Sequence, residues 1–383
     1  MDAMITRDSP PAGAGDREPR GITGTQLAGL AGRIKAWGRE LGFQQVGIAG
    51  VDLAADEALL ERWLAEGRHG EMAYMERHGS RRARPAELVP GTARVISARM
   101  DYLPETAADP WRVIHDPRLG YVSRYALGRD YHRLMRKRLQ ALADRIAAFA
   151  GPFGYRVFTD SAPVLEKPLA RNAGLGWIGK HTNLINTSAG SWFFLGEIYT
   201  DLALPEDRAA QDRCGVCRAC IDVCPTGAIT GPYRMDARHC ISYLTIELRG
   251  SIPVELRPLM GNRIYGCDDC QLVCPWNRYA RFAAEAGFLP RHDLDAPALL
   301  ELFRWSEEDF LRIMTGSAIR RIGYACWLRN VAVALGNAPY DPLIVQGLRG
   351  RGNDPSPLVR EHVAWALEQQ ERKRTDSRDP SPS

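Results

Sequence analysis

Seven of the nine cysteines in this 383-residue chain lie in two short runs, and their spacing constrains the fold more than any other feature. The first run, CGVCRACIDVCP, begins at Cys214, and the second, CDDCQLVCPW, begins at Cys267. Each run ends with a cysteine directly before proline. Bacterial two-cluster ferredoxins show this spacing, because three thiolates bind one four-iron cluster and the fourth binds the other. The runs therefore predict a ferredoxin-like domain with two 4Fe-4S clusters.

The crossed pattern divides the cysteines into two sets. The second run lacks the first cysteine of a complete motif, since Ile264 occupies that position, so its cluster needs a thiolate from elsewhere. Cys240 is the better source, because Cys326 lies in a predicted helix well downstream. The first cysteine set is predicted to be Cys214, Cys217, Cys220 and Cys274, and the second cysteine set Cys224, Cys240, Cys267 and Cys270.

Zinc and disulfides are the alternative uses of these cysteines. A zinc ribbon built from two CxxC pairs needs four thiolates and leaves four cysteines unexplained. Disulfides belong to oxidising compartments, whereas the first 22 residues contain neither an apolar run long enough for a secretory signal nor a twin-arginine pair. No window approaches the ~20 apolar residues that span a bilayer. We therefore expect a cytoplasmic protein without a membrane partner.

Hydrophobic periodicity predicts an α+β chain in which the cysteine runs separate two other domains. Residues 25–205 alternate helical and strand-like segments and predict a mixed α/β domain. Its expected elements are a helix over 25–41, strands over 45–49, 94–103, 155–159 and 191–200, and a long helix ending at Gly151. A ferredoxin-type domain is expected over 206–285 and a helical domain over 286–370, with disordered tails over 1–24 and 371–383. The segments LRNVAVALGN and LVREHVAWALEQ resemble each other and indicate a HEAT-like repeat in the helical domain.

Three short segments partly match known cofactor-binding motifs, but the surrounding sequence does not support those functions. Gly174, Gly176 and Gly179 spell GxGxxG, but a predicted helix precedes them instead of a strand. The overlapping GLGWIGKH resembles a P-loop, yet His181 stands where Ser or Thr must hold magnesium. A closely packed glycine turn is expected there. The run from Asp130 to His132 partly matches the DxHxxG motif of some cobalamin enzymes but lacks its glycine, so we expect a helix-start Asp and a surface His.

Asp160 is the candidate proton donor for a reduction fed by the clusters. It follows an apolar strand and precedes SAPVLEKP, where a carboxyl can face a pocket. To act as an acid near neutral pH it needs a raised pKa, chiefly through desolvation. A cap on a helix that begins at Pro163 explains the same residue equally well.

Several longer motifs, taken with the cysteine runs, resemble the epoxyqueuosine reductase family over roughly residues 25–370. These motifs are RRARPAELVPGTARVISARMDYLP, SRYALGRDYH, TDSAPVLEKPLARNAGLGWIGKHTNLI, CISYLTIE and YGCDDCQLVCPWN. The resemblance implies a cobalamin-dependent iron-sulfur enzyme, related to reductive dehalogenases, that reduces the epoxide of epoxyqueuosine to an alkene at the wobble position of a tRNA. It implies that the N-terminal domain binds cobalamin and that Asp160 is the proton donor. It also implies the eight cluster cysteines as cluster ligands. The cobalamin contacts that it implies are Arg82, Asp160, His181 and Ser242, although His181 departs from the Asn often found at its position.

The implied partners are the anticodon stem-loop of a tRNA and an electron donor, with the chain expected to be a monomer. Residues 316–375 carry eight Arg and one Lys against five acidic residues, which favours a phosphate backbone as partner. A reductive dehalogenase-like enzyme acting on a small organic substrate is the main alternative, and the basic repeat module argues against it. A ferredoxin subunit that only carries electrons would not need so large an N-terminal domain.

Overall fold

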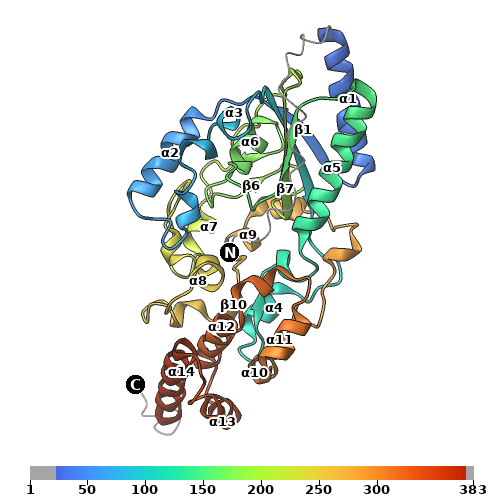
Figure 1. Ribbon diagram of the computed structural model, residues 1–383. Coiled ribbons are helices and arrows are strands. Elements are labelled where there is room, and N and C mark those ends of the chain that lie inside the picture. The colour runs from blue at the N-terminus through green and yellow to red at the C-terminus, as the bar shows by residue number, and fades with distance from the viewer. Residues whose placement is uncertain (1–22, 377–383) are drawn as a thin grey trace.

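The computed structural model describes residues 23–376, and a four-stranded sheet forms the centre of its N-terminal part (Figure 1). The strands lie in the order β1-β2-β7-β4, and every neighbouring pair is antiparallel. They are β1 (Gln45–Ala49), β2 (Arg94–Asp101), β4 (Tyr155–Phe158) and β7 (Phe193–Thr200). All four predicted strands are confirmed, with small differences at their ends.

Helices cover both faces of this sheet. Helices α1 (Gly24–Glu40) and α5 (Tyr131–Ala150) pack on one face, where Ile34 and Leu139 share a core with Ile198. Helix α6 (Glu166–Asn172) packs on the other face, where Leu169 meets Tyr199. Successive residues of β7 thus serve opposite cores, because side chains alternate along a strand. The result is three layers, helix, sheet and helix, in the mixed architecture that the sequence predicts.

Short elements connect these layers to the cysteine region. Between β1 and α5 lie α2 (Ala54–Ala65), η1 (Ala73–Met75), η2 (Gly79–Arg82), α3 (Pro85–Leu88), α4 (Pro110–His115), β3 (Tyr121–Val122) and η3 (Arg124–Ala126). The glycine-rich turn after α6 leads into the hairpin of β5 (Trp177–Ile178) and β6 (Leu184–Ile185). A Cβ atom on Gly176 would lie 2.3 Å from the carbonyl oxygen of Ile185, so the predicted close packing of this turn is confirmed.

The cysteine region contains many short elements. These are α7 (Ala219–Asp222), β8 (Ile229–Gly231), β9 (Arg234–Met235), η4 (Ala237–His239), α8 (Ile241–Ile246), η5 (Pro258–Met260), β10 (Arg263–Tyr265), α9 (Asp269–Leu272), η6 (Pro275–Tyr279) and η7 (Ala286–Phe288). Strand β10 pairs in parallel with β3, and Ile264, at the position of the missing cysteine, is fully buried. Because one core includes both Val122 and Ile264, the cysteine region packs directly against the N-terminal part of the chain.

The C-terminal part is helical and shares that core. It consists of α10 (Leu299–Arg304), α11 (Glu307–Ile313), η8 (Ala318–Ile322), α12 (Tyr324–Asn337), α13 (Pro342–Gly350) and α14 (Pro357–Asp376). The two similar segments form α12 and α14, which touch where Gly336 meets Trp365. Arg329 of α12 is fully buried and donates to the carbonyl oxygens of Leu244 and Leu248, which ties α12 to α8. The HEAT-like character of these helices stays a prediction.

Helix α14 extends beyond the predicted end of the helical domain. Residues 371–376 are helical, in contrast to the predicted tail from 371. Lys373 Nζ donates to the carbonyl oxygens of Gly336 and Ala338 at 2.6 and 2.7 Å, and Arg372 pairs with Glu368 one turn earlier. These contacts hold the polar end of the helix against α12. Residues 1–22 and 377–383 of the predicted tails lie outside the described residues. From residue 23 to residue 376, no helix is long and apolar enough to cross a membrane.

Candidate functional site

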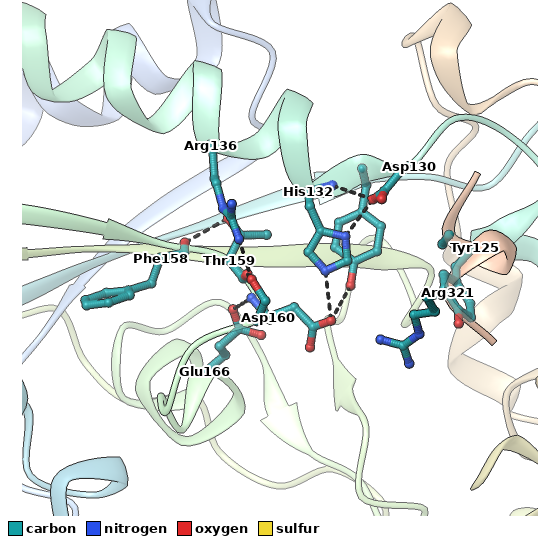
Figure 2. Close-up of polar contacts among 12 residues, drawn as sticks. Tyr125, Asp130, His132, Arg136, Phe158, Thr159, Asp160, Glu166 and Arg321 are labelled. Carbon is teal, nitrogen blue, oxygen red and sulfur yellow. Dashed lines mark hydrogen bonds and ion pairs between the residues drawn. The ribbon is translucent and has the colours of Figure 1, made fainter. Parts of the chain in front are cut away.

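Asp160 lies in a tight loop between β4 and α6 (Figure 2). Its φ angle is +48°, in the left-handed region that few residues other than glycine adopt. Its backbone N–H donates to Glu166 Oε1 at 2.6 Å, which fixes the loop to the start of α6. Helix α6 begins at Glu166 without a side-chain cap, so the helix-cap interpretation of Asp160 is wrong. The Asp160 side chain is 49% exposed and can meet a bound molecule.

Two donors from the start of α5 converge on one carboxylate oxygen of Asp160. Tyr131 donates its hydroxyl to Oδ2 at 2.9 Å, and His132 Nε2 lies 3.1 Å from the same oxygen. The other ring nitrogen of His132, Nδ1, lies 2.6 Å from Asp130 Oδ1. Asp130 caps α5 as predicted, through the backbone N–H of His132. His132 is not the expected surface residue, because its side chain is 19% exposed and bridges two carboxylates.

The charges in this group determine where its protons lie. Burial raises the pKa of Asp160, but the hydrogen bond and charge of His132, the hydrogen bond of Tyr131 and the charge of Arg321 outweigh burial and bring it to about 2. Burial lowers the pKa of His132, but its bonds to Asp130 and Asp160 raise it to about 9. The raised pKa that Asp160 alone would need to act as an acid near neutral pH is therefore not present in this arrangement. At neutral pH, Asp160 is a carboxylate beside a protonated His132.

Two further carboxyls lie behind Asp160. Burial, followed by the charge of Asp160, raises the pKa of Glu166 to about 7. Glu197 of β7 is fully buried, and burial together with the charge of Glu166 raises its pKa well above the usual range. The surroundings of Glu197 therefore favour its neutral form.

The first cysteine set lines one cavity, although its members come from both runs. The wall of this cavity includes Cys214, Cys217, Cys220, Cys274, Lys180 and His181. Trp177 Nε1 donates to Cys214 Sγ at 3.4 Å. Lys180 Nζ donates to the carbonyl oxygens of Gly215 and Cys217 at 2.5 and 2.9 Å, so it holds the cysteine loop in place. The structure thus brings together the four cysteines that the crossed pattern groups.

Members of the second cysteine set also lie near one another, and all four are partly buried. Burial, together with the charges of Cys240 and Cys224, raises the pKa of Cys270 well above its ordinary value. Cys267 is close to Cys240 as well, because the charge of Cys240 contributes to the raised pKa of Cys267 after burial and Asp269. Cys326 lies apart in α12, with Sγ 3.9 Å from the carbonyl oxygen of Arg249. All nine cysteines are free of disulfides.

Lys167 is within electrostatic reach of both the second cysteine set and Asp160. Lys167 Nζ donates to the carbonyl oxygen of Thr182 at 3.0 Å and to Asn183 Oδ1 at 3.1 Å. Burial lowers the pKa of Lys167, while the charges of Cys270, Glu166, Asp160 and Cys240 act in the opposite direction. The charge of Cys220, from the first set, also reaches Cys270. Cys270 is therefore within electrostatic reach of Cys220, and Lys167 is within reach of both Cys270 and Asp160.

The predicted cobalamin contacts lie in three places. Arg82 is buried, donates through Nη2 to the carbonyl oxygen of Tyr74 at 2.8 Å, and has no partner for Nε among residues 23–376. Burial, then the charges of Glu247 and Asp160, raise the pKa of Tyr74 to about 12, so Tyr74 is within electrostatic reach of Asp160. Ser242 follows Cys240 at the start of α8. His181 lies in the wall of the first-set cavity and not beside Asp160.

Sequence reasoning missed several members of the site. Tyr131, His132, Lys167, Glu197 and Arg321 surround Asp160 or act on its charge, and Figure 2 shows Arg321 approaching from the C-terminal part. Two of these could have been found, because Tyr131 and His132 belong to SRYALGRDYH, one of the motifs of the resemblance. Lys167 likewise stands in TDSAPVLEKP.

Two sets of cysteines suited to iron-sulfur clusters, together with the ionised Asp160 beside protonated His132, define an iron-sulfur oxidoreductase. Residues 213–277 match the 4Fe-4S double cluster binding domain, and residues 82–161 match the family described as epoxyqueuosine reductase QueG, DUF1730. The chain belongs to the epoxyqueuosine reductase family. Two 4Fe-4S clusters are therefore among its cofactors, and the zinc and disulfide alternatives are wrong.

Individual relatives agree over most of the chain. It is 63% identical to the epoxyqueuosine reductase of Pseudomonas aeruginosa, over 89% of this chain and 94% of the relative, and 60% identical to that of Escherichia coli, over 89% of both. A crystal structure of epoxyqueuosine reductase with an epoxyqueuosine-modified tRNA-Tyr stem loop is similar, with a TM-score of 0.82, 27% identity and coverage of 90% and 91%. The Bacillus subtilis reductase, solved with its aspartate catalytic loop swung out of the active site, has a TM-score of 0.80 and 26% identity, with coverage of 93% and 96%.

Proposed function

We propose that this chain reduces epoxyqueuosine to queuosine in tRNA with cobalamin and two 4Fe-4S clusters, and that Asp160 delivers the proton. The reaction joins the epoxide with two electrons and two protons and yields the alkene and water. The observation that carries the proposal is the bridge between Asp160 and protonated His132. Identity of 60–63% to epoxyqueuosine reductases supports the substrate.

The surroundings of Asp160 fit a cobalamin. A buried guanidinium nitrogen without a partner, Arg82 Nε, needs an acceptor, and the amide side chains at the edge of a corrinoid supply carbonyl oxygens. Ser242, two residues after Cys240, would contact the cofactor near the second cysteine set. A contact between His181 and cobalamin stays a prediction. When bound, reduced cobalamin supplies a strong nucleophile or electron donor. The protein residues then position the substrate and move protons.

The cysteine sets are the proposed ligands of the two clusters, which supply one-electron transfer. Cys217 of the first set is exposed, while Cys270 of the second set lies near Lys167 and Asp160. We infer that a reductant reaches the protein at the first set. The exposed position of Cys217 makes that side accessible to a protein or chemical electron donor.

Asp160 and His132 divide the proton work. Opening the epoxide leaves negative charge on its oxygen, and an acid within hydrogen-bond reach neutralises that charge as it develops. Asp160 would transfer to the epoxide oxygen a proton that it receives from His132, whose Nε2 lies 3.1 Å from Asp160 Oδ2. An aspartate catalytic loop that swings out in the Bacillus subtilis reductase supports a role for the strained Asp160 loop. Entry of substrate and cofactor desolvates the pair, which favours the neutral form of both groups.

The proposed macromolecular partner is the anticodon stem-loop of tRNA, bound by a monomer in the cytoplasm. A related reductase has been crystallised with such a stem loop. In this chain, Arg320 and Arg321 of η8 bring positive charge toward Asp160 from the C-terminal part. A phosphate backbone beside the modified nucleotide matches that charge.

The test is anaerobic purification followed by metal analysis and a turnover assay. The proposal predicts about eight iron atoms in two four-iron clusters and one cobalt per chain after incubation with cobalamin. With a chemical reductant and epoxyqueuosine-containing tRNA, nucleoside analysis by mass spectrometry should then show queuosine. Protein without cobalamin is the control and should give none. Failure to bind a corrinoid, or queuosine formation without one, would contradict the proposal.

A further inference from the structure

His181 is enclosed in the wall of the cavity formed by the first cysteine set. Its side chain belongs to the turn between β5 and β6, and the residue is 1% exposed. The same wall contains Cys214, Cys217, Cys220 and Cys274. The ring therefore lies among the groups proposed to hold one cluster and is shielded from water.

The hydrogen bonds of His181 identify which ring nitrogen carries the proton. Nδ1 accepts the backbone N–H of Asn183 at 3.1 Å, so the proton of the neutral ring is on Nε2. Nε2 has no partner anywhere in residues 23–376. A buried N–H donor without an acceptor destabilises a fold, and such a group indicates a partner that the protein itself does not supply.

The other polar groups near this cavity already have partners. Lys180 Nζ is bonded to the carbonyl oxygens of Gly215 and Cys217, and Trp177 Nε1 to Cys214 Sγ. The Trp177 bond shows that the fold directs one ring N–H at a sulfur of this set. In contrast, the N–H group at His181 Nε2 is buried and has no acceptor among residues 23–376.

We propose that His181 Nε2–H donates a hydrogen bond to a sulfur of the cluster held by the first cysteine set and raises the reduction potential of that cluster. The added electron makes the cluster sulfurs more negative, so the bond is stronger in the reduced state. His181 is thus a positioning residue that makes the first cluster easier to reduce by the external donor. This inference rests on the proposed ligand set, but not on the substrate.

The test compares the two cluster potentials in His181→Leu, His181→Gln and the unchanged protein. Redox titrations followed by EPR would be made on samples with matched iron content. In His181→Leu one potential should become more negative while the other stays, and His181→Gln should shift less because its amide keeps an N–H. His239→Leu, at an exposed histidine beside Cys240, is the matched control and should change neither potential. Unchanged potentials in His181→Leu would overturn the inference.

A second measurement decides the matter if His181→Leu cannot hold iron. The unchanged protein, with 15N-labelled histidine, would be reduced and examined by pulsed EPR. A coupling between a histidine nitrogen and one cluster that disappears in His181→Gln supports the inference. Its absence in the unchanged protein, or its persistence in His181→Gln, overturns the inference. Low iron in the unchanged protein would instead contradict the proposed cluster ligands, so the two failures are distinguishable.

Discussion

His132 Nε2 lies 3.1 Å from Asp160 Oδ2, while the opposite ring nitrogen lies 2.6 Å from Asp130. The imidazolium is held between two carboxylates, which raises the pKa of His132 to about 9 although burial alone would lower it. Asp160 is ionised for the same reason. The acid of this site is therefore the pair of residues and not Asp160 alone.

This pairing predicts the pH dependence of turnover. Because the pKa of His132 is raised to about 9, the proton is present below that pH and is lost as the pH rises through it. Turnover should stay level up to about pH 8 and fall above about pH 9. In His132→Gln, turnover should fall by about tenfold or more at neutral pH, and the decrease near pH 9 should disappear. A variant that keeps this decrease would show that another group titrates.

Cysteine substitutions test the ligand sets. Cys270→Ser should lose about four of eight iron atoms, because it removes a ligand of one four-iron cluster. Cys326→Ser is the control, since Cys326 is a buried cysteine that lies in α12 and away from both sets. It should keep all of its iron. Iron analysis and absorption spectra of anaerobic protein measure both outcomes, and equal iron loss in the two variants would contradict the assignment.

Arg329 should be a major contributor to stability. Its buried guanidinium donates to the carbonyl oxygens of Leu244, Leu248 and Gly250. Arg329→Met leaves these acceptors unsatisfied, at roughly 1–3 kcal/mol each, and should lower the thermal midpoint by several degrees. Arg304→Ala removes an exposed pair with Glu301, so it should change stability by less than about 0.5 kcal/mol. Equal midpoints for the two variants would show that α12 is not anchored in this way.

Binding of the tRNA stem-loop should weaken as salt rises. Plots of log affinity against log salt should be linear with a negative slope, because phosphate contacts release counterions. Arg320 is exposed, has no ion pair within residues 23–376, and stands next to Arg321 near Asp160. Arg320→Ala should reduce the steepness of the slope by about one, whereas Arg304→Ala should leave it unchanged. Salt-independent affinity would count against a phosphate interface.

Local spacing predicts which cysteines group together, and the cavity lined by Cys214, Cys217, Cys220 and Cys274 agrees with the predicted placing of Cys274 in the first set. The spacing of a cluster motif follows from the geometry of the metal centre, so it is visible in the sequence. The strands and long helices were also predictable, because each has a regular hydrophobic period. The helical end of α14 was missed because its stability comes from Lys373, which contacts carbonyl groups on α12, and no local pattern records that contact.

The surroundings of Asp160 were not predictable in the same way. The contact between His132 and Asp160 joins residues 28 positions apart and depends on how α5 packs against the sheet. For this reason the sequence alone predicts a surface position for His132 and gives no sign that His132 lowers the pKa of Asp160. His181 shows the same limit, since only the folded chain places it beside the first cysteine set.

The most direct test of the account is single-turnover reduction of epoxyqueuosine-containing tRNA by Asp160→Asn. The variant should keep its iron, because Asp160 is not a proposed ligand of either cluster. It should also bind cobalamin as the unchanged protein does. Its rate of queuosine formation should fall by about 100-fold or more, as expected for loss of a proton donor. A rate within a few-fold of the unchanged protein would contradict the role of Asp160 and, with it, the proposed division of proton work with His132.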